Sequence, residues 1–221
     1  MFTELTASDG HKLDCWIEGA QGARKGGIVI LQEIFGVTDQ LKSVAARYAA
    51  LGFEVAIPAL FDRFEKDAVI PFTEGPRGRD MMLASNLETT MLDVDAAVQA
   101  LKAKGGKVGV IGFCWGGGLA IRAAQILDIG AAVAFYGTRL PQYQIAPLKA
   151  PVQGHYGSND SHVPAEMLDA ARAFFPDMEV FTYEGAGHAF ANDARPADYV
   201  EEAAEEAHER TEAFLISRLA S

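Results

Sequence analysis

The chain has 221 residues, of which 49% are hydrophobic and 22% charged, and its formal net charge is −11. This length suits one sizeable domain with a buried core, and we expect a single domain over residues 1–221. A strongly acidic chain lacks the basic surface that phosphate contacts require, which argues against nucleic-acid binding. No apolar run approaches the roughly 20 residues of a membrane-spanning helix. The first residues lack the basic and apolar regions of a secretory signal, so we expect a cytoplasmic protein.

Short apolar runs alternate with amphipathic stretches along most of the chain. This alternation predicts the α/β class, with a mostly parallel central sheet and helices on both faces. The expected strands are 13–17, 27–31, 53–57, 107–111, 131–136, 151–156 and 178–183. The expected helices are 41–51, 87–101, 119–127 and an acidic terminal helix that includes 201–206.

The segment 58–79 interrupts the alternation. We expect an irregular loop there, because five prolines and glycines break regular structure: Pro58, Pro71, Gly75, Pro76 and Gly78. Long loops in compact domains often form lids or the walls of binding sites. The segment also contains the richest positive charge near a possible active site, namely Arg63, Arg77 and Arg79.

Residues 112–118 read Gly-Phe-Cys-Trp-Gly-Gly-Gly, a pattern of the Gly-x-Ser-x-Gly kind with cysteine in the place of serine. Such a nucleophile elbow turns sharply from a strand into a helix, and its glycines let the backbones pack closely. Cys114 would then lie at the first turn of a helix, where the helix dipole and unbonded N–H groups favour a thiolate. The N–H of Trp115, the next residue, is a candidate donor to a substrate oxyanion.

A cysteine nucleophile needs a histidine base, and the base needs an acid that orients it. Asp160 lies in a polar turn after the strand 151–156, and His188 lies in a glycine-flanked loop after the strand 178–183. Because active-site groups gather at the carboxyl ends of parallel strands, we expect both loops to converge on the elbow. The chain order of nucleophile, acid and histidine is that of α/β-hydrolases.

The other histidines are weaker candidates for the base. His162 is near Asp160 and stays open as the alternative, although it lacks the glycine-rich loop of His188. His155 falls within a predicted strand, where a hydrogen-bonded core role is expected. His11 and His208 have polar neighbours in the sequence, so we expect them to be solvated.

The residues that follow the strand 27–31 complete the candidate site. A second oxyanion donor normally comes from the loop after an early strand, and the N–H of Ile34 is the candidate here. Glu33 directly follows the apolar strand, so it either points into the site, where it would affect the thiol, or starts a helix at the surface.

Four segments in chain order resemble the dienelactone hydrolase family over nearly the whole chain. They are 32–36, 112–117, the Asp-x-x-Val-Pro turn at Asp160, and 187–191. The resemblance implies an α/β-hydrolase fold with a Cys-His-Asp triad, in a monomer without cofactor or metal, that opens the enol-lactone ring of dienelactones. It also implies that Glu33 holds the resting cysteine and helps to activate it when substrate arrives.

Two positions depart from the family pattern. Family members carry a carboxylate-binding arginine shortly after the histidine motif, where this chain has Asn192, with Arg195 three residues further on. They also have an aromatic-rich stretch after an arginine before the elbow, whereas Arg79 is followed here by Asp-Met-Met-Leu. The candidate substrate contacts are therefore Phe35, Arg79 and Asn192.

Sulfur chemistry narrows the substrate independently of the resemblance. A thiolate leaves a tetrahedral intermediate as readily as an alkoxide does, so ordinary esters revert, whereas enolates, phenolates and thiolates depart. We therefore expect hydrolysis of small enol lactones or activated esters through a thioester. Two alternatives remain: a class I amidotransferase-like enzyme, which orders its partners as His then Glu, and a non-catalytic hydrolase fold that senses oxidants or binds ligands.

Overall fold

The computed structural model describes residues 1–220, which divide into two compact units. The first unit contains residues 1–109 and the end of the chain from Leu219, and the second contains Val110–Arg218. The single-domain organisation expected from the length stays a prediction. Within residues 1–220, no helix is both long and apolar enough to cross a bilayer.

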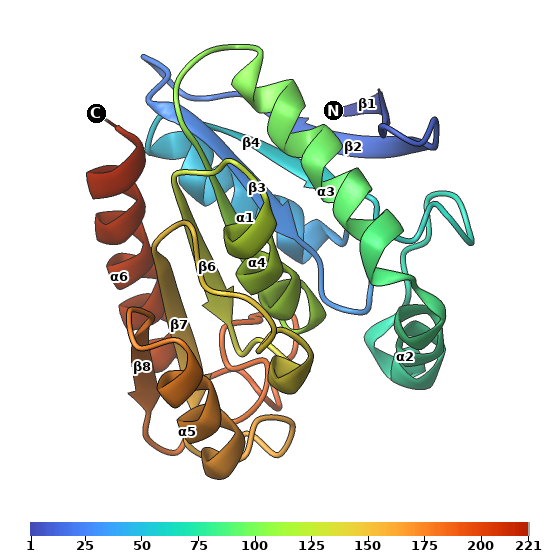
Figure 1. Ribbon diagram of the computed structural model, residues 1–221. Coiled ribbons are helices and arrows are strands. Elements are labelled where there is room, and N and C mark those ends of the chain that lie inside the picture. Colours follow the sequence, from blue (N-terminus) through green and yellow to red (C-terminus); the bar gives the residue numbers. More distant parts are fainter. Residues whose placement is uncertain (221) are drawn as a thin grey trace. The chain divides into compact units, whose positions relative to one another are not determined.

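In the first unit, four strands are hydrogen-bonded in the order β1-β2-β4-β3 (Figure 1). The pairs β1–β2 and β2–β4 are antiparallel, whereas β3 and β4 run parallel. Helices α1 and α3 pack against β3 and β4. The elements of this unit are β1 (Phe2–Thr6), β2 (Lys12–Glu18), β3 (Gly26–Leu31), α1 (Asp39–Ala50), β4 (Phe53–Pro58), the 3₁₀ helix η1 (Phe72–Glu74), α2 (Gly75–Ala84) and α3 (Leu87–Lys102).

In the second unit, the strand order is β5-β6-β7-β8, and the pairs β6–β7 and β7–β8 are parallel. Helix α4 packs against β6, and α6, red in Figure 1, lies against β7 and β8 through hydrogen bonds of Thr211 and Arg210. The elements are β5 (Val108–Phe113, with Val110 onward in this unit), α4 (Trp115–Ile126), β6 (Ala131–Phe135), the 3₁₀ helix η2 (Leu140–Gln142), β7 (Val152–Gly157), α5 (Ala165–Phe174), β8 (Glu179–Tyr183) and α6 (Glu201–Leu219).

Burial explains why the sequence revealed most of the strands. Every residue of β3, β4, β5, β6 and β7 is buried, as in parallel strands that helices cover on both faces, so these strands read as continuous apolar runs. β1 is an edge strand and is mostly exposed, so its sequence contains no continuous apolar run. It was therefore not expected from the sequence. Helices α1 and α3 start where Thr38 and Asn86 accept N–H groups of their first turns.

The expected irregular loop over 58–79 is wrong in its second part, because η1 and α2 occupy Phe72–Ala84. Pro76 lies in the first turn of α2. Backbone N–H groups there form no hydrogen bond within the helix, so a proline, which has no N–H, costs the helix nothing. Gly78 serves close packing rather than helix breaking, since a Cβ there would overlap the carbonyl of Ile34. Pro76 therefore marks the start of α2, and Gly78 marks the face of α2 that packs against Ile34.

Candidate active site

The elbow predicted around Cys114 lies in the second unit. β5 ends at Phe113 and α4 begins at Trp115, so Cys114 alone connects the strand to the helix. Its backbone angles, φ 53° and ψ −115°, are rarely adopted by residues other than glycine. Such strain is typical of functional positions. Its N–H donates to the Phe135 carbonyl at 3.0 Å, and its carbonyl accepts from the Thr138 N–H at 3.1 Å. The backbone thus holds Cys114 at the apex from both sides.

Glycines make this turn sterically possible. A Cβ on Gly112 would overlap the Gly116 carbonyl, and a Cβ on Gly117 would lie 2.6 Å from the Cα of Gly137. A Cβ on Gly118 would overlap the ring of Tyr143. Backbone atoms, which cannot rotate away as a flexible side chain can, obstruct all three positions, since a Cβ on Gly118 would also lie 2.5 Å from the Thr138 carbonyl oxygen. The glycine pattern of the sequence therefore reflects close approach of the elbow to the residues after β6.

The structure brings three of the predicted residues together in one line of contacts. Nε2 of His188 lies 3.1 Å from Sγ of Cys114, and Nδ1 of the same ring lies 2.8 Å from Oδ2 of Asp160. The Asp160 side chain is fully buried and that of His188 is 14% exposed. His188, and not the alternative His162, is the histidine that bridges the thiol and the carboxylate.

Backbone contacts fix the distance between the Asp160 turn and the His188 loop. The Asn159 N–H donates to the Ala186 carbonyl and the Gly185 N–H donates to the Ser158 hydroxyl, both at 2.9 Å. The other carboxylate oxygen of Asp160, Oδ1, accepts the His162 N–H at 2.8 Å. Asp160 therefore both shapes its own turn and orients His188.

Charge interactions across the triad shift the pKa values of two of its members. Burial alone would raise the pKa of Asp160, but hydrogen bonds from the His188 ring and the His162 N–H lower it overall. Burial alone would lower the pKa of His188, but the hydrogen bonds and negative charges of Asp160 and Cys114 raise it to about 10. At neutral pH the protonated His188 therefore places a positive charge 3.1 Å from Sγ of Cys114.

Two aromatic rings flank His188. The ring of Tyr136 meets it edge-on with centroids 5.2 Å apart, and the ring of His162 lies with its centroid at 4.4 Å. Tyr136 and Ala189, like Cys114, have positive φ, at 40° and 61°. Three strained residues are thus in or beside the triad. Tyr136 was not among the site residues expected from the sequence, where its one signal was its position at the end of the predicted strand 131–136.

The remaining predicted residues of this unit have clear local settings. Trp115 is 2% exposed and is the first residue of α4, so its N–H lies at the N-terminal end of that helix. Asn192 is 2% exposed, and its Oδ1 accepts the Ala194 N–H at 3.1 Å, which stabilises the turn after His188. Arg195 pairs with Asp198 at 2.7 Å.

Four predicted residues lie in the first unit. Glu33, Ile34 and Phe35 follow β3 after Gln32. Glu33 is 7% exposed, and the centroid of the Phe35 ring lies 4.8 Å from that of Phe72. Arg79 is exposed on α2. Arg63 forms an ion pair with the buried Asp93. The roles of Glu33, Ile34, Phe35 and Arg79 toward Cys114 stay predictions.

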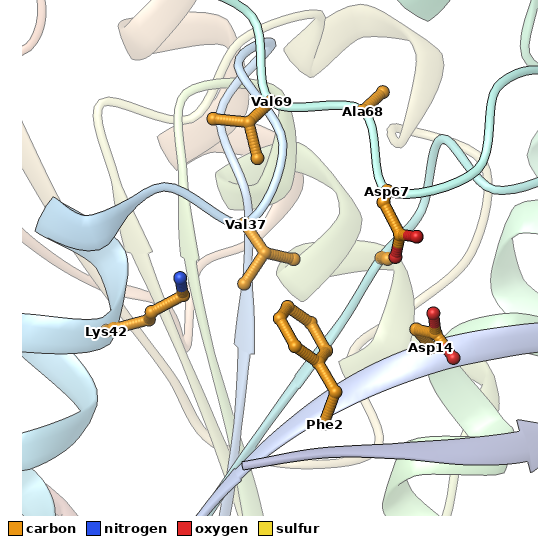
Figure 2. A pocket seen from close by; sticks show the side chains of 8 residues that line it. Phe2, Asp14, Val37, Lys42, Asp67, Ala68 and Val69 are labelled. Atoms are coloured by element: carbon orange, nitrogen blue, oxygen red, sulfur yellow. The ribbon is translucent and has the colours of Figure 1, made fainter.

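The first unit also contains a cavity of about 390 Å³ (Figure 2). Phe2, Val37 and Val69 gather around its centre, with Lys42 on one side and Asp14 and Asp67 on the other. None of the predicted catalytic residues lines it. Within residues 1–220, no group of three or more His, Cys, Asp or Glu side chains could hold a metal ion.

Comparisons with known proteins identify relatives along the whole chain. The model of the dienelactone hydrolase family matches residues 13–218. A carboxymethylenebutenolidase of Pseudomonas putida is 31% identical over 229 residues, which cover 97% of each chain.

Two solved structures are similar in fold. A dienelactone hydrolase-like promiscuous phosphotriesterase from metagenomic libraries has a TM-score of 0.81 at 21% identity, covering 99% of this chain and 98% of that one. The Pyrococcus furiosus esterase Pf2001 has a TM-score of 0.74 at 19% identity, covering 100% of this chain and 93% of that one. The predicted α/β-hydrolase fold is confirmed.

Proposed function

Because the chain belongs to the dienelactone hydrolase family, we propose that it hydrolyses enol lactones or activated carboxylic esters through a thioester on Cys114. The observation that carries this proposal is the unbroken line from Sγ through the His188 ring to the Asp160 carboxylate, with contacts of 3.1 and 2.8 Å. In the amidotransferase-like alternative, a glutamate after the histidine would orient the base. Here Asp160, which precedes His188, occupies that position.

In the first half of the reaction, the Cys114 thiolate attacks the carbonyl carbon of the substrate. The carbonyl oxygen becomes an oxyanion, which the N–H groups of Trp115 and Ile34 are proposed to bind. The C–O bond to the leaving group then breaks, and Nε2 of His188 donates its proton to the departing oxygen. Asp160 keeps the other proton on Nδ1 and stabilises the charged ring until the transfer.

In the second half, neutral His188 removes a proton from water, and the resulting hydroxide attacks the thioester carbonyl. The C–S bond breaks, the carboxylic acid product leaves and gives its proton to solvent, and the thiolate and imidazolium are restored together. No cofactor takes part in either half, and each bond that forms is matched by one that breaks. The proposed partner is one small ester or lactone molecule at a monomeric enzyme.

The protonated His188 also favours substrates with good leaving groups. An imidazolium whose pKa is raised to about 10 is a weaker acid than an ordinary histidine, so it assists poorly with a strongly basic alkoxide. An enolate or phenolate departs with little help. The triad's own electrostatics therefore support the substrate class that sulfur chemistry suggests.

The first-unit residues have proposed supporting roles. Glu33 would hold the resting thiol, and Phe35 and Arg79 would contact the substrate. Asn192, the third candidate contact, lies directly after the His188 loop. It would affect substrate binding indirectly, by stabilising the turn that follows this loop. Single substitutions Phe35→Ala and Arg79→Ala should raise KM more than they lower kcat if these side chains bind substrate.

The decisive experiment compares Cys114→Ala with Cys15→Ala on p-nitrophenyl acetate and cis-dienelactone. Cys114→Ala should abolish turnover of both, while Cys15→Ala, which changes a buried cysteine on β2, should keep it. Mass spectrometry of acid-quenched enzyme should find the acyl group on Cys114. Unchanged rates in Cys114→Ala would overturn the proposal, and an alkylatable Cys114 without any hydrolysis would favour the sensing alternative.

A further inference from the structure

We propose that His162 is a positioning residue that keeps the His188 ring aligned with Cys114 and Asp160. When His162 gains a proton, it lowers the fraction of Cys114 that is present as thiolate. The inference rests on the proposed function in one respect, the identity of Cys114 as the nucleophile. It goes further by assigning pH control of that nucleophile to a residue outside the triad.

The first observation is the packing around His188. The His162 ring lies at a centroid distance of 4.4 Å and an interplanar angle of 59°, and the Tyr136 edge lies at 5.2 Å. Tyr136 is 1% exposed and therefore fixed, whereas His162 is exposed. Of these two ring contacts, that of His162 comes from the exposed residue, and it limits rotation of the His188 ring. Its removal would free the base to rotate away from Sγ.

The second observation is how firmly the His162 backbone is held. Its N–H donates to Oδ1 of Asp160 at 2.8 Å, while Oδ2 of the same carboxylate bonds His188. One carboxylate therefore fixes the backbone of one histidine and the ring of the other. Since the N–H belongs to the main chain, a substitution of His162 changes the ring contact and leaves this hydrogen bond in place.

The third observation is the set of charges that face the His162 ring. Burial and the positive charges of His188 and Arg195 lower the pKa of His162 below its ordinary value of 6.5, and the Asp160 carboxylate opposes them. His162 is therefore neutral at pH 7. On acidification it becomes a second imidazolium next to His188. Repulsion between the two rings is relieved when His188 gives its proton to Cys114, which converts the thiolate into an unreactive thiol.

The test measures alkylation of Cys114 by iodoacetamide between pH 5 and 8.5, because this reaction reports the thiolate and needs no ester hydrolysis. His162→Phe keeps a ring beside His188 and removes the titration, whereas His162→Ala removes both. His11→Phe, the same change in the first unit, is the matched control. Ring-proton NMR of His188 and His162 over the same pH range assigns each titration.

In the wild-type protein we expect the alkylation rate to fall on acidification with a slope steeper than one proton. His162→Phe should retain about three- to tenfold more of its pH 8 rate at pH 5, equivalent to a shift of ~0.5–1 pH unit. His162→Ala should lose kcat at pH 8 with little change in KM, and His162→Phe should recover most of that loss.

Two results would overturn the proposal. One is an alkylation profile of His162→Phe that superimposes on those of wild type and His11→Phe, and that result would leave ester hydrolysis by Cys114 standing. The other is equal kcat at pH 8 in His162→Ala and wild type, which would remove the positioning role. Failure of Cys114 to react at any pH would instead overturn the proposed function, and this inference with it.

Discussion

The Asp160 carboxylate and the His188 ring meet through a 2.8 Å contact between Oδ2 and Nδ1, in which the carboxylate can only accept and the ring must donate. This contact fixes the tautomer, so that Nε2 faces Sγ of Cys114. In Asp160→Asn an amide of the same shape can present an N–H to Nδ1 and favour the wrong tautomer. We expect kcat to fall about 10²–10⁴-fold with folding retained, as for other triads. Steady-state kinetics with p-nitrophenyl acetate and circular dichroism check both parts. Loss of less than a factor of ten would contradict the orienting role.

The raised pKa of His188, about 10 against an ordinary 6.5, predicts a pH effect with a definite sign. Because the folded protein holds this proton more tightly than the unfolded chain, the stabilisation is complete below pH 6.5 and is lost as the pH rises toward about 10. The hydrolysis rate should fall over the alkaline end of the same range, since the leaving group loses its proton donor. In Cys114→Ala the His188 pKa should drop, because one hydrogen bond and one negative charge disappear. NMR titration of the ring measures the shift, with Cys15→Ala as the control that should not move it.

The two cysteines should differ sharply in reactivity. Cys15 is fully buried on β2, and burial raises its pKa to about 12, so it stays a thiol at pH 8. Cys114 is partly exposed beside the protonated His188. Native protein treated with a thiol reagent at pH 8 should take up one equivalent, located on Cys114 by peptide mapping. Cys114→Ala should take up none until it is unfolded. Rapid labelling of Cys15 in the native state would contradict this expectation.

The strands and the contacts that join Cys114, His188 and Asp160 could be predicted from the sequence because each has a strong local signal. Buried parallel strands are apolar throughout, the elbow needs glycines around its nucleophile, and Asp160 and His188 each follow a recognisable strand. The contacts of His162 and Tyr136 with His188 carry no such signal, because they connect residues that are 26 and 52 positions away in the chain.

Context also reverses the meaning of some residues. Pro76 and Gly78 suggested a loop but belong to α2, since a proline in the first turn and a glycine at a close contact are both compatible with a helix. His208 was expected to be solvated because its neighbours in the sequence are acidic. It is 5% exposed, and its ring lies 4.9 Å from that of Phe135. An acidic helix still buries one face, and the side of α6 that does so depends on the sheet beneath it.

A glycine in the elbow provides a direct test of the turn. In Gly112→Ala the added Cβ would overlap the Gly116 carbonyl, so the elbow must distort. We expect the free energy of unfolding to fall by about 3 kcal/mol, in the upper range for overpacking, and activity to be lost. Gly19→Ala is the matched control, because nothing lies within 4 Å of a Cβ there, and its stability should change by less than about 0.5 kcal/mol. Urea unfolding of both variants measures the difference. Equal stability of the two would mean that the elbow is looser than its contacts indicate.

The buried His155 should limit stability in acid. Its Nε2 lies 3.0 Å from Oε1 of Gln153, which can only accept, so Nε2 carries the proton and Nδ1 accepts from the Tyr183 hydroxyl at 2.8 Å. Burial, together with the charges of His208 and Arg210, lowers the His155 pKa from 6.5 to about 3. Below pH 6.5 the unfolded chain therefore binds a proton that the folded protein excludes, and stability is lost as the pH falls.

Between pH 7 and 5 this single group should reduce the free energy of unfolding by about 2 kcal/mol, at most 1.36 kcal/mol per pH unit. His155→Gln should be less stable at pH 7, since it loses ring packing against Phe135 and Phe181, but its stability should change less with pH. Urea unfolding at pH 7, 6 and 5 measures the two slopes, with His11→Gln as the control that should follow the wild type. If His155→Gln loses stability in acid as steeply as the wild type, protonation of another group controls acid unfolding.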